Sequence, residues 1–347
     1  MFSHRTTVNG RVNLIGEHLD YNGGMVLPAA LSVSLKIKLV LRNDQNVLVR
    51  SDGYKPIARH LSEDALDHWS DPVVGAVKEG KKLGLNDCGA NIEITSSIPV
   101  GSGLSSSAAL ITAVLKAIRD ACGGTHSDMD IAIAAKRVEN NYMGVPCGIM
   151  DQIAVGLLET GKAIALDTRT LNHDLLELPS SHAFVVIHSG ISRRLADSNY
   201  GARKHECDQL KSLLRTEDLC LIDPKEVLKA PIREYLKKRA LHCIDEHRRV
   251  LRAVQALREG DMDCFGNEMN ESHNSMRDQF EISIPEIDSL VSDAQNAGAI
   301  GARLTGAGFG GCIVACIPQD TEDSFLKKVL GVHPLATHID TIAGERS

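Results

Sequence analysis

The amino-acid sequence predicts a mixed α and β fold arranged in two domains. Segments typical of strands and segments typical of helices alternate along the chain, which is the pattern of a mixed fold. The chain has 347 residues, more than one small hydrophobic core accommodates. Strand-rich sequence changes to helix-rich sequence near residue 175. We therefore expect one domain over residues 1–175 and a second over residues 176–347.

The first expected domain contains strands followed by two helices. Residues 25–50 are rich in strand-forming residues, and four apolar side chains alternate there as in a half-buried strand. These side chains are Leu35, Ile37, Leu39 and Leu41. Residues 91–98 form the next expected strand, and helices are expected over residues 105–122 and 127–143. The first helix is predicted by the helical spacing of Leu110, Val114, Leu115 and Ile118.

The rest of the chain combines short apolar strands with charged amphipathic helices. The strands are expected at residues 163–167, 183–188, 299–304 and 312–317. The helices are expected at residues 201–215, 233–259 and 286–297. The longest of them carries an apolar stripe that we expect to face the core. This stripe consists of Leu241, Ile244, Leu251, Val254 and Leu257.

Composition argues against several classes of function. The net charge is -7 and the sequence pI is about 6.1, so a nucleic-acid-binding surface is not expected. Aromatic residues make up only 3% of the chain, too few for a base-stacking platform. The sequence shows neither a membrane-spanning run nor a signal peptide. The nine cysteines are scattered without a CxxC pair, so we expect reduced thiols and a cytoplasmic protein.

The densest group of polar side chains lies at residues 10–24, GRVNLIGEHLDYNGG. Arg11, Glu17, His18 and Asp20 lie there among small and apolar residues. Carboxylates accept hydrogen bonds, histidine donates or accepts them, and arginine supplies a fixed positive charge. Such a set suits a small ligand covered in hydroxyl groups, with the arginine able to meet a phosphate.

A loop rich in glycine and serine, PVGSGLSSSAAL, lies at residues 99–110 between an expected strand and an expected helix. Glycine lets backbone amides approach an anion, the helix N-terminus adds unpaired N–H groups, and the serines add hydroxyl groups. These features suit a triphosphate, and one serine can ligate a magnesium ion. The loop matches neither GxxxxGK[ST] nor a Rossmann GxGxxG motif. An ordinary serine N-cap of the helix is the alternative interpretation.

Two further segments have the composition of a functional site. Residues 139–152, ENNYMGVPCGIMDQ, place Glu139 at the expected end of a helix and Asp151 after a tight loop. Asp151 can serve as a general base or a metal ligand, or as the N-cap of the next helix. Residues 301–316, GARLTGAGFGGCIVAC, place four glycines just before a strand. So many glycines favour a backbone that approaches a ligand over a simple tight turn.

Together these motifs resemble those of the GHMP kinases and, among them, the galactokinases. GRVNLIGEHLDY resembles the galactokinase signature, residues 99–110 the second motif of the superfamily, and residues 304–312 its third. Further galactokinase segments are similar to CGIMDQ, SNYGARKHEC and ESHNSMRDQFEISIPEID, at residues 147–152, 198–207 and 271–288. The resemblance extends over nearly the whole chain. It implies an N-terminal domain like the second domain of ribosomal protein S5 and a ferredoxin-like C-terminal domain.

The resemblance also implies a role for each matching residue. Asp151 matches the catalytic aspartate, and Arg11 matches the arginine beside the anomeric hydroxyl and the transferred phosphate. Sugar contacts are implied for Glu17, His18, Asp20, Gly148 and Tyr200. The ATP phosphates are expected at Gly101, Ser102, Gly103, Leu104, Ser105, Ser106 and Ser107, with Mg²⁺ held by Ser107 and Glu139. The third motif supplies Gly306, Gly308 and Gly310.

The implied activity is ATP- and Mg²⁺-dependent phosphorylation of galactose at its anomeric hydroxyl by a monomeric enzyme. Its expected partners are the sugar and ATP, with no nucleic acid and no membrane. Two alternatives stay open: a 1-kinase for N-acetylgalactosamine, galacturonate or arabinose, and a non-catalytic sensor of galactose and ATP. Leu19 stands where galactokinases commonly have threonine, and Asn9 replaces a proline. Leu19 faces either the core or the sugar, so it bears on the identity of the sugar.

Overall fold

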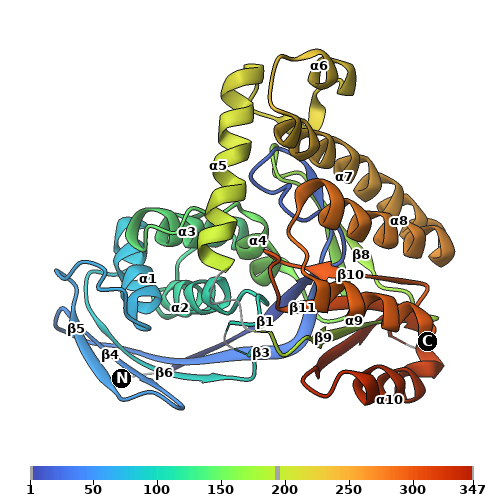
Figure 1. Ribbon diagram of the computed structural model, residues 1–347. Coiled ribbons are helices and arrows are strands. Elements are labelled where there is room, and N and C mark those ends of the chain that lie inside the picture. Colours follow the sequence, from blue (N-terminus) through green and yellow to red (C-terminus); the bar gives the residue numbers. More distant parts are fainter. Residues whose placement is uncertain (1–2, 100, 192–195, 346–347) are drawn as a thin grey trace. The chain divides into compact units, whose positions relative to one another are not determined.

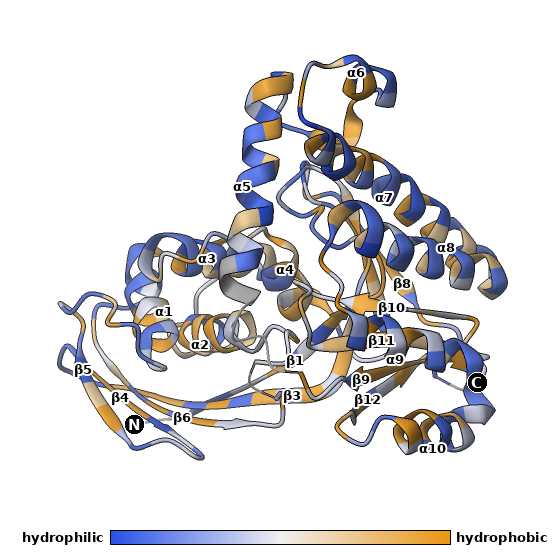
Figure 2. Ribbon diagram, in the orientation of Figure 1, coloured by the Kyte–Doolittle hydropathy of each residue, from blue (hydrophilic) through white to orange (hydrophobic). Residues whose placement is uncertain are grey.

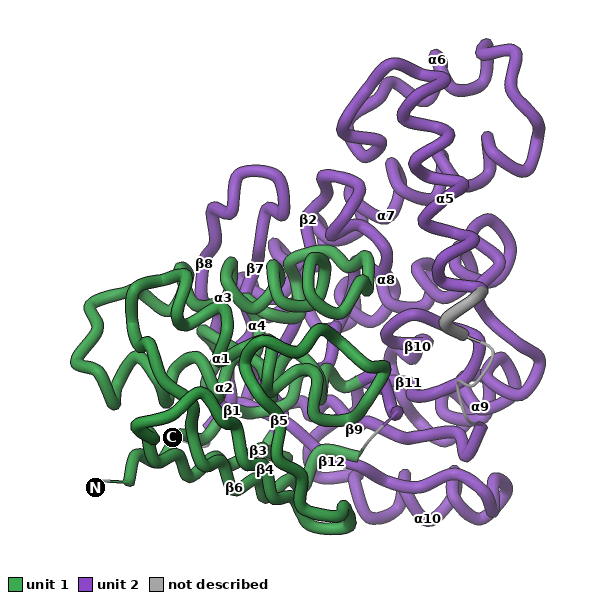
Figure 3. Tube along the Cα trace, turned by 90° about the vertical axis from the view of Figure 1, so that its left-hand side faces the viewer, with its two compact units in different colours: residues 1–11, 32–100, 104–159 green, residues 12–31, 101–103, 160–347 purple. Residues whose placement is uncertain are grey.

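The chain forms two compact units (Figure 3). A computed structural model, drawn in Figure 1, describes residues 3–99, 101–191 and 196–345. Unit 1 comprises residues 1–11, 32–100 and 104–159, and unit 2 comprises residues 12–31, 101–103 and 160–347. The chain therefore passes between the units several times, and the single boundary at residue 175 stays a prediction.

Unit 1 contains a twisted sheet whose strands follow the order β3-β6-β4-β5, with β1 beside β3. The strands are β1 (His4–Asn13), β3 (Pro28–Leu41), β4 (Asn46–Ser51), β5 (Ile57–His60) and β6 (Ala90–Ser96), and the last residues of β1 and first residues of β3 belong to unit 2. β3 runs antiparallel to β6, whereas β4 and β6 are parallel. Leu35, Ile37 and Leu39 are buried, which confirms the predicted alternation, and Leu41 is half-buried.

Four helices of unit 1 lie together beside this sheet (Figure 1). They are α1 (Asp71–Lys82), α2 (Ser106–Ala121), α3 (Asp128–Arg137) and α4 (Met150–Leu157). Val114, Leu115 and Ile118 of α2 are fully buried, as their spacing predicts. The helix expected over residues 127–143 is present as α3 followed without a gap by a π-helical turn at Val138–Tyr142. Such turns often occur at functional sites, and this one contains Glu139.

Unit 2 is built around a four-stranded antiparallel sheet in the order β10-β11-β9-β12. The strands are β9 (His182–His188), β10 (Gly301–Thr305), β11 (Cys312–Pro318) and β12 (Thr337–Ala343). Helices separate β9 from β10 and β11 from β12, which is the ferredoxin-like connectivity. Three shorter strands, β2 (Met25–Val26), β7 (Lys162–Asp167) and β8 (His173–Glu177), pair antiparallel in the same unit. The mixed fold class is therefore confirmed.

Six helices belong to unit 2, and the longest, α7, alternates between hydrophilic and hydrophobic residues (Figure 2). The helices are α5 (Ala196–Leu214), α6 (Pro224–Lys229), α7 (Glu234–Glu259), α8 (Met262–Ser275), α9 (Pro285–Asn296) and α10 (Glu322–Val332). Ile244, Val254 and Leu257 are buried as the predicted stripe requires, and Leu241 is half-buried. The stripe is wrong at Leu251, which is 47% exposed. At that turn the buried face is formed by Val250, Ala253 and Val254, because the 3.6-residue period drifts from a seven-residue repeat.

The other expected strands and helices are present with boundaries shifted by a few residues. The elements that were not predicted from the sequence are β1, β5, α1, β8, α6, α8, α10 and β12. Several of these are short or rich in polar residues, so their hydrophobic periodicity is weak. In the described part of the chain, no helix is long and apolar enough to cross a bilayer. Each of the nine cysteines lies in the described ranges and is a thiol.

Three serines, Ser70, Ser105 and Ser127, precede helices of unit 1, and only Ser127 caps its helix through its side chain. The Ser127 hydroxyl accepts from the Asp130 amide at 3.1 Å, and Asp130 accepts from the Ser127 amide at 2.8 Å, which completes a capping box for α3. Ser105 precedes α2 but makes no such hydrogen bond. We expect Ser127→Ala to lower the free energy of unfolding by about 1 kcal/mol in urea titrations. Ser105→Ala is the matched control, and an equal loss there would contradict this account.

Candidate active site

The residues expected to form the site fall in both units, and each group has its own geometry. Unit 1 contains Arg11, Glu139, Gly148, Asp151 and the segment 104–107. Unit 2 contains the other expected residues, namely Glu17, His18, Asp20, Gly101, Ser102, Gly103, Tyr200, Gly306, Gly308 and Gly310.

Arg11 and Asp151 form an ion pair in unit 1. Arg11 donates from Nε at 2.9 Å and from Nη2 at 2.7 Å, both to Oδ1 of Asp151. The arginine side chain is 5% exposed and the aspartate side chain is 33% exposed. Ile149 is the N-cap of helix α4, which begins at Met150. Asp151 therefore lies inside the first turn and does not cap the helix. The interpretation of Asp151 as an ordinary N-cap is therefore wrong.

The backbone of Arg11 also meets the serine-rich segment of unit 1. Its amide donates to the carbonyl of Leu104 at 3.4 Å. Ser105, the residue before α2, adopts a left-handed conformation with φ of 62°, and its buried hydroxyl has no hydrogen-bond partner among the described residues. Left-handed backbone is costly for a residue with a side chain and is frequently found at functional sites. The loop geometry thus differs from that of a side-chain N-cap.

The glycines before this segment also have positive φ values, 75° at Gly101 and 79° at Gly103. They belong to unit 2, and Ser102 there is buried. Val100, in the same predicted loop, lies outside the described residues. Residues 101–107 therefore turn sharply at 101, 103 and 105 before the first amides of α2. Those amides have no partners within their own helix and carry the positive end of its dipole.

Glu139 is a buried carboxylate surrounded by neutral donors. It accepts from the Gln152 amide and from Cys147 Sγ, the latter at 3.6 Å. Burial raises the pKa of Glu139, the hydroxyl of Ser107 beside it lowers this pKa, and the charge of Asp151 raises it. The net pKa lies above the usual value. A cation would relieve this cost by stabilising the charged carboxylate.

The chemistry of Glu139 and Ser107 fits a magnesium ion. Mg²⁺ takes one or two protein carboxylates and completes its shell with substrate phosphates and water. The described residues contain no cluster of three or more His, Cys, Asp or Glu side chains arranged for a metal. The pair of one buried carboxylate and one buried serine hydroxyl is a smaller donor set, compatible with an ion that also binds phosphate and water.

In unit 2, Glu17 is held by four donors from the rest of the unit. Asn13 Nδ2 and Arg303 Nη2 donate to Oε2 at 2.8 and 2.5 Å. The Gly306 amide donates to Oε1 at 2.8 Å, and the Thr305 hydroxyl lies 3.2 Å from it. Burial raises the pKa of Glu17, whereas the charge of Arg303 lowers it. The signature and the third glycine motif are therefore joined through one carboxylate.

His18 adopts a left-handed conformation with φ of 61° and lies in an aromatic cluster. Its Nδ1 is 2.6 Å from the Tyr21 hydroxyl and its Nε2 is 3.3 Å from the Ala307 carbonyl. A neutral imidazole protonated at Nε2 satisfies both contacts. The ring of Tyr200 lies 5.4 Å from the His18 ring and 6.0 Å from the Tyr21 ring. Within unit 2 the structure thus brings Tyr200 to the signature, where Asp20 is half-buried.

Leu19 is fully buried and contributes to the core of unit 2. A Cβ atom on Gly24 would come within 2.9 Å of Leu19 Cβ and 2.7 Å of Cys220 Sγ. The carbonyl of Leu19 accepts from the amides of Asn22 and Gly24. This packing favours the core interpretation of Leu19 over a sugar contact.

The third glycine motif needs its glycines for the path of the backbone. Positive φ values occur at Gly306, Gly308, Gly310 and Gly311, and also at Phe309 with 58°. A Cβ atom on Gly308 would lie 2.5 Å from the carbonyl oxygen of Ile282. Close backbone contact within the unit therefore accounts for part of the glycine content, and the ligand contact stays a prediction.

Three residues that contact Glu17, Gly16 or one another in unit 2 were not predicted from the sequence: Arg303, Glu246 and Ser272. Arg303 Nε donates to the Ser272 hydroxyl at 3.1 Å, and that hydroxyl donates to Glu246 at 2.5 Å. Arg303 and Glu246 have no exposed surface. The sequence contained one indication of the role of Arg303, namely an arginine inside the short strand GARLT. Charged residues are rarely buried unless they are paired, so such an arginine indicates a buried partner.

The chain matches three family models. The model described as "GHMP kinases N terminal domain" matches residues 71–157, and "GHMP kinases C terminal" matches residues 253–331. "Galactokinase galactose-binding signature" matches residues 5–37. A galactokinase of Clostridium beijerinckii is 39% identical over 92% of this chain and 86% of its own length. A galactokinase of Enterococcus faecalis is 37% identical over 92% of this chain and 87% of its own.

Solved structures give the same result. The galactokinase of Lactococcus lactis complexed with galactose superposes with a TM-score of 0.93 and 32% identity, covering 99% of this chain and 94% of that one. The mevalonate kinase of Methanococcus jannaschii has a TM-score of 0.70 at 20% identity, covering 99% of this chain and 98% of that one. The second match concerns the fold alone.

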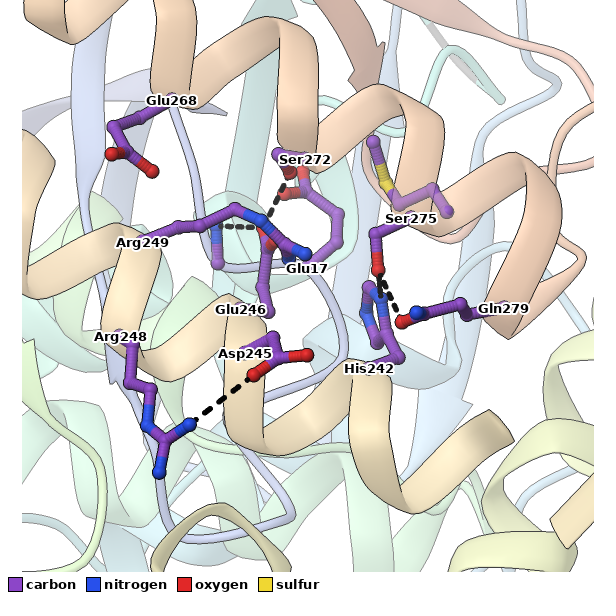
Figure 4. Close-up of polar contacts among 12 residues, drawn as sticks. Glu17, His242, Asp245, Glu246, Arg248, Arg249, Glu268, Ser272, Ser275 and Gln279 are labelled. Atoms are coloured by element: carbon purple, nitrogen blue, oxygen red, sulfur yellow. Dashed lines mark hydrogen bonds and ion pairs between the residues drawn. The ribbon is translucent and has the colours of Figure 1, made fainter. Parts of the chain in front are cut away.

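Buried His242 predicts a pH dependence of stability. Its Nδ1 lies 2.8 Å from the Ser275 hydroxyl (Figure 4), and burial lowers its pKa from 6.5 to about 4. Between these values the unfolded chain binds a proton that the folded chain does not, so stability falls as the pH falls. We expect this one residue to account for a loss on the order of 3 kcal/mol between pH 6.5 and 4.

The measurement is urea unfolding of wild type and His242→Asn across that pH range. The variant should show a shallower dependence on pH, although its stability at neutral pH falls because of the altered packing. Exposed His338 provides the matched control, His338→Asn. Equal slopes in wild type and His242→Asn would contradict the assignment.

Proposed function

The chain belongs to the galactokinase family of the GHMP kinases, and from this premise we propose that it transfers the terminal phosphoryl group of ATP to the anomeric hydroxyl of galactose. The observation that carries the proposal is the Arg11–Asp151 ion pair, in a chain whose residues 5–37 match the galactose-binding signature. The products are galactose 1-phosphate and ADP.

Asp151 is the proposed general base. A sugar hydroxyl is a weak nucleophile, and removing its proton as the phosphoryl group arrives increases its reactivity. Both nitrogens of Arg11 bind the same oxygen, Oδ1, so the ion pair leaves Oδ2 for another partner. Arg11 fixes the carboxylate and supplies positive charge where the phosphoryl group gains negative charge. The arrangement of these two side chains supports a role for Asp151 in accepting the proton and a role for Arg11 in stabilising charge.

ATP is the proposed phosphoryl donor, bound at residues 101–107. Ser105 precedes α2, and Ser106 and Ser107 are the first two residues of this helix. Their hydroxyl groups and the first amides of the helix provide donors for phosphate oxygens. Ser107 and Glu139 would hold Mg²⁺, which neutralises phosphate charge when it is bound. The buried hydroxyl of Ser107 and the raised pKa of Glu139 support this assignment.

Galactose is the proposed acceptor, contacted by Glu17, His18, Asp20, Gly148 and Tyr200. The fixed carboxylate of Glu17 and the ring contact between His18 and Tyr200 support a prepared set of hydroxyl-binding groups. The burial of Leu19 supports galactose rather than a different sugar, because the substituted side chain packs in the core. The nine thiols support a reducing, cytoplasmic compartment, and the monomeric state stays a prediction.

An assay of ADP release with Mg-ATP and a panel of sugars tests the proposal. We expect galactose to stimulate release far more than N-acetylgalactosamine, galacturonate or arabinose. Stimulation by one of those sugars in place of galactose would identify a related 1-kinase. Galactose binding without any sugar-dependent release would favour the sensor and overturn the proposed activity.

Asp151→Asn should abolish turnover while galactose still binds, because the amide keeps the shape of the side chain but cannot accept the proton. General-base catalysis contributes typically about 10²–10⁴-fold, so kcat should fall by at least about a hundredfold. ADP release measures turnover, and calorimetry with galactose measures binding. Asp128→Asn, at a partly exposed carboxylate of the same unit, serves as the control. Near-normal kcat in Asp151→Asn would overturn the role of Asp151 as base.

A further inference from the structure

Four charged side chains form a balanced cluster in the interior of unit 2, and Figure 4 shows three of them, Glu17, Glu246 and Arg249. Glu17 and Glu246 carry the negative charges, and Arg249 and Arg303 carry the positive ones. All four are at most 8% exposed. They come from the signature, helix α7 and strand β10, which lie far apart in the sequence. A buried cluster of this kind is costly to assemble and is stable only when every charge has its partners.

Glu246 holds the backbone of the signature directly. Its Oε1 accepts from the Gly16 amide at 3.1 Å and from the Ser272 hydroxyl at 2.5 Å, and its Oε2 accepts from Arg249 at 2.7 Å. Gly16 has a φ of 106°, and a Cβ atom there would lie 2.8 Å from the carbonyl oxygen of Met25. The carboxylate thus fixes the residue immediately before Glu17 in a conformation that only glycine accepts readily.

Arg303 uses its whole guanidinium group at the same place. Nε donates to the Ser272 hydroxyl, Nη1 donates to the carbonyl of Leu14 at 3.1 Å, and Nη2 donates to Glu17. Lysine cannot replace this planar set of donors, because its ammonium group is a single point at the end of a flexible chain. Ser272 belongs to the segment ESHNS, so this network also gives a role to a motif that the catalytic assignment leaves unused.

We propose that Glu246 and Arg303 are positioning residues for galactose phosphorylation, which fix the Glu17 carboxylate and the Gly16 backbone in the geometry that binds the sugar. Neither residue needs to touch the substrate, because both act through Glu17 and Gly16. The inference rests on the proposed function, since it concerns how the same signature binds galactose. Loss of either residue should therefore weaken galactose binding more than the use of ATP.

The test compares Arg303→Lys, Glu246→Gln and Ser272→Ala in the full-length chain, by steady-state kinetics with galactose and with Mg-ATP. Arg303→Lys keeps the positive charge but loses the planar set of donors. Glu246→Gln keeps the shape of the side chain but loses the negative charge. We expect the KM for galactose to rise about tenfold in both, the scale of a hydrogen bond to a charged group. Ser272→Ala keeps every charge and should raise it about threefold. The KM for ATP should stay at its wild-type value.

Asp245→Asn is the matched control, because it removes a carboxylate from the neighbouring position of α7 (Figure 4). Asp245 pairs with Arg248 at 3.4 Å, and both side chains are substantially exposed. Thermal unfolding is measured for every variant, and Ser272→Ala carries the test if the charged variants do not fold. A lower Tm with an unchanged KM for galactose in the folded variants would overturn the positioning role alone. Wild type without galactose-dependent ADP release would overturn the proposed function and this inference with it.

Discussion

The buried ion pair between Arg303 and Glu17 is the interaction on which the signature in unit 2 depends. Taking either charge out of water costs several kcal/mol, about what the paired and hydrogen-bonded arrangement recovers. The charge of Arg303 is shared, since its Nη2 also lies 3.6 Å from Glu246. Burial raises the pKa of Glu246, yet Arg303, His242, Arg249 and the Ser272 hydroxyl together outweigh burial and hold this pKa below its usual value. Removing one member would leave the others buried without compensation, so the network constrains both strand β10 and the signature.

A strained backbone conformation occurs in each of the three motifs that the sequence predicts to bind substrates. Each contains one non-glycine residue with a positive φ: His18 in the signature, Ser105 in the phosphate loop and Phe309 in the third glycine motif. Such conformations persist only where surrounding contacts enforce them. His18 is held by Tyr21 and Ala307, and the amide of Phe309 donates to the carbonyl of Ile282 at 2.8 Å. Positive φ values also occur at Asp67, Leu171, Arg215 and Glu281, so strain alone does not identify the motifs.

The sequence was sufficient for the fold class and for most strands and helices, because their hydrophobic periodicity is strong. It was insufficient where a tertiary contact decides the outcome. Leu251 follows the apolar spacing of α7 yet is exposed, and Glu139 lies in a π-helical turn that no local pattern predicts. For the site, residue types identified Arg11 and Asp151, and the structure adds that they form an ion pair within unit 1. The contacts of Arg303 with Glu17 and of Glu246 with Gly16 could not be predicted from sequence, since these pairs are 286 and 230 residues apart.

The two carboxylates proposed to act in unit 1, Asp151 and Glu139, lie in different environments. Asp151 is partly exposed and paired with a permanent cation, so its charge is compensated by the protein itself. Glu139 is buried, and the groups that donate to it, Gln152 and Cys147, are neutral. Its charge is therefore costly until a cation arrives, which supports the proposed role of Glu139 as a metal ligand. A base must accept a proton at the reacting hydroxyl, and a partly exposed carboxylate with one oxygen outside its ion pair is suited to that task. Differences in burial and pairing thus support different proposed functions for the two carboxylates.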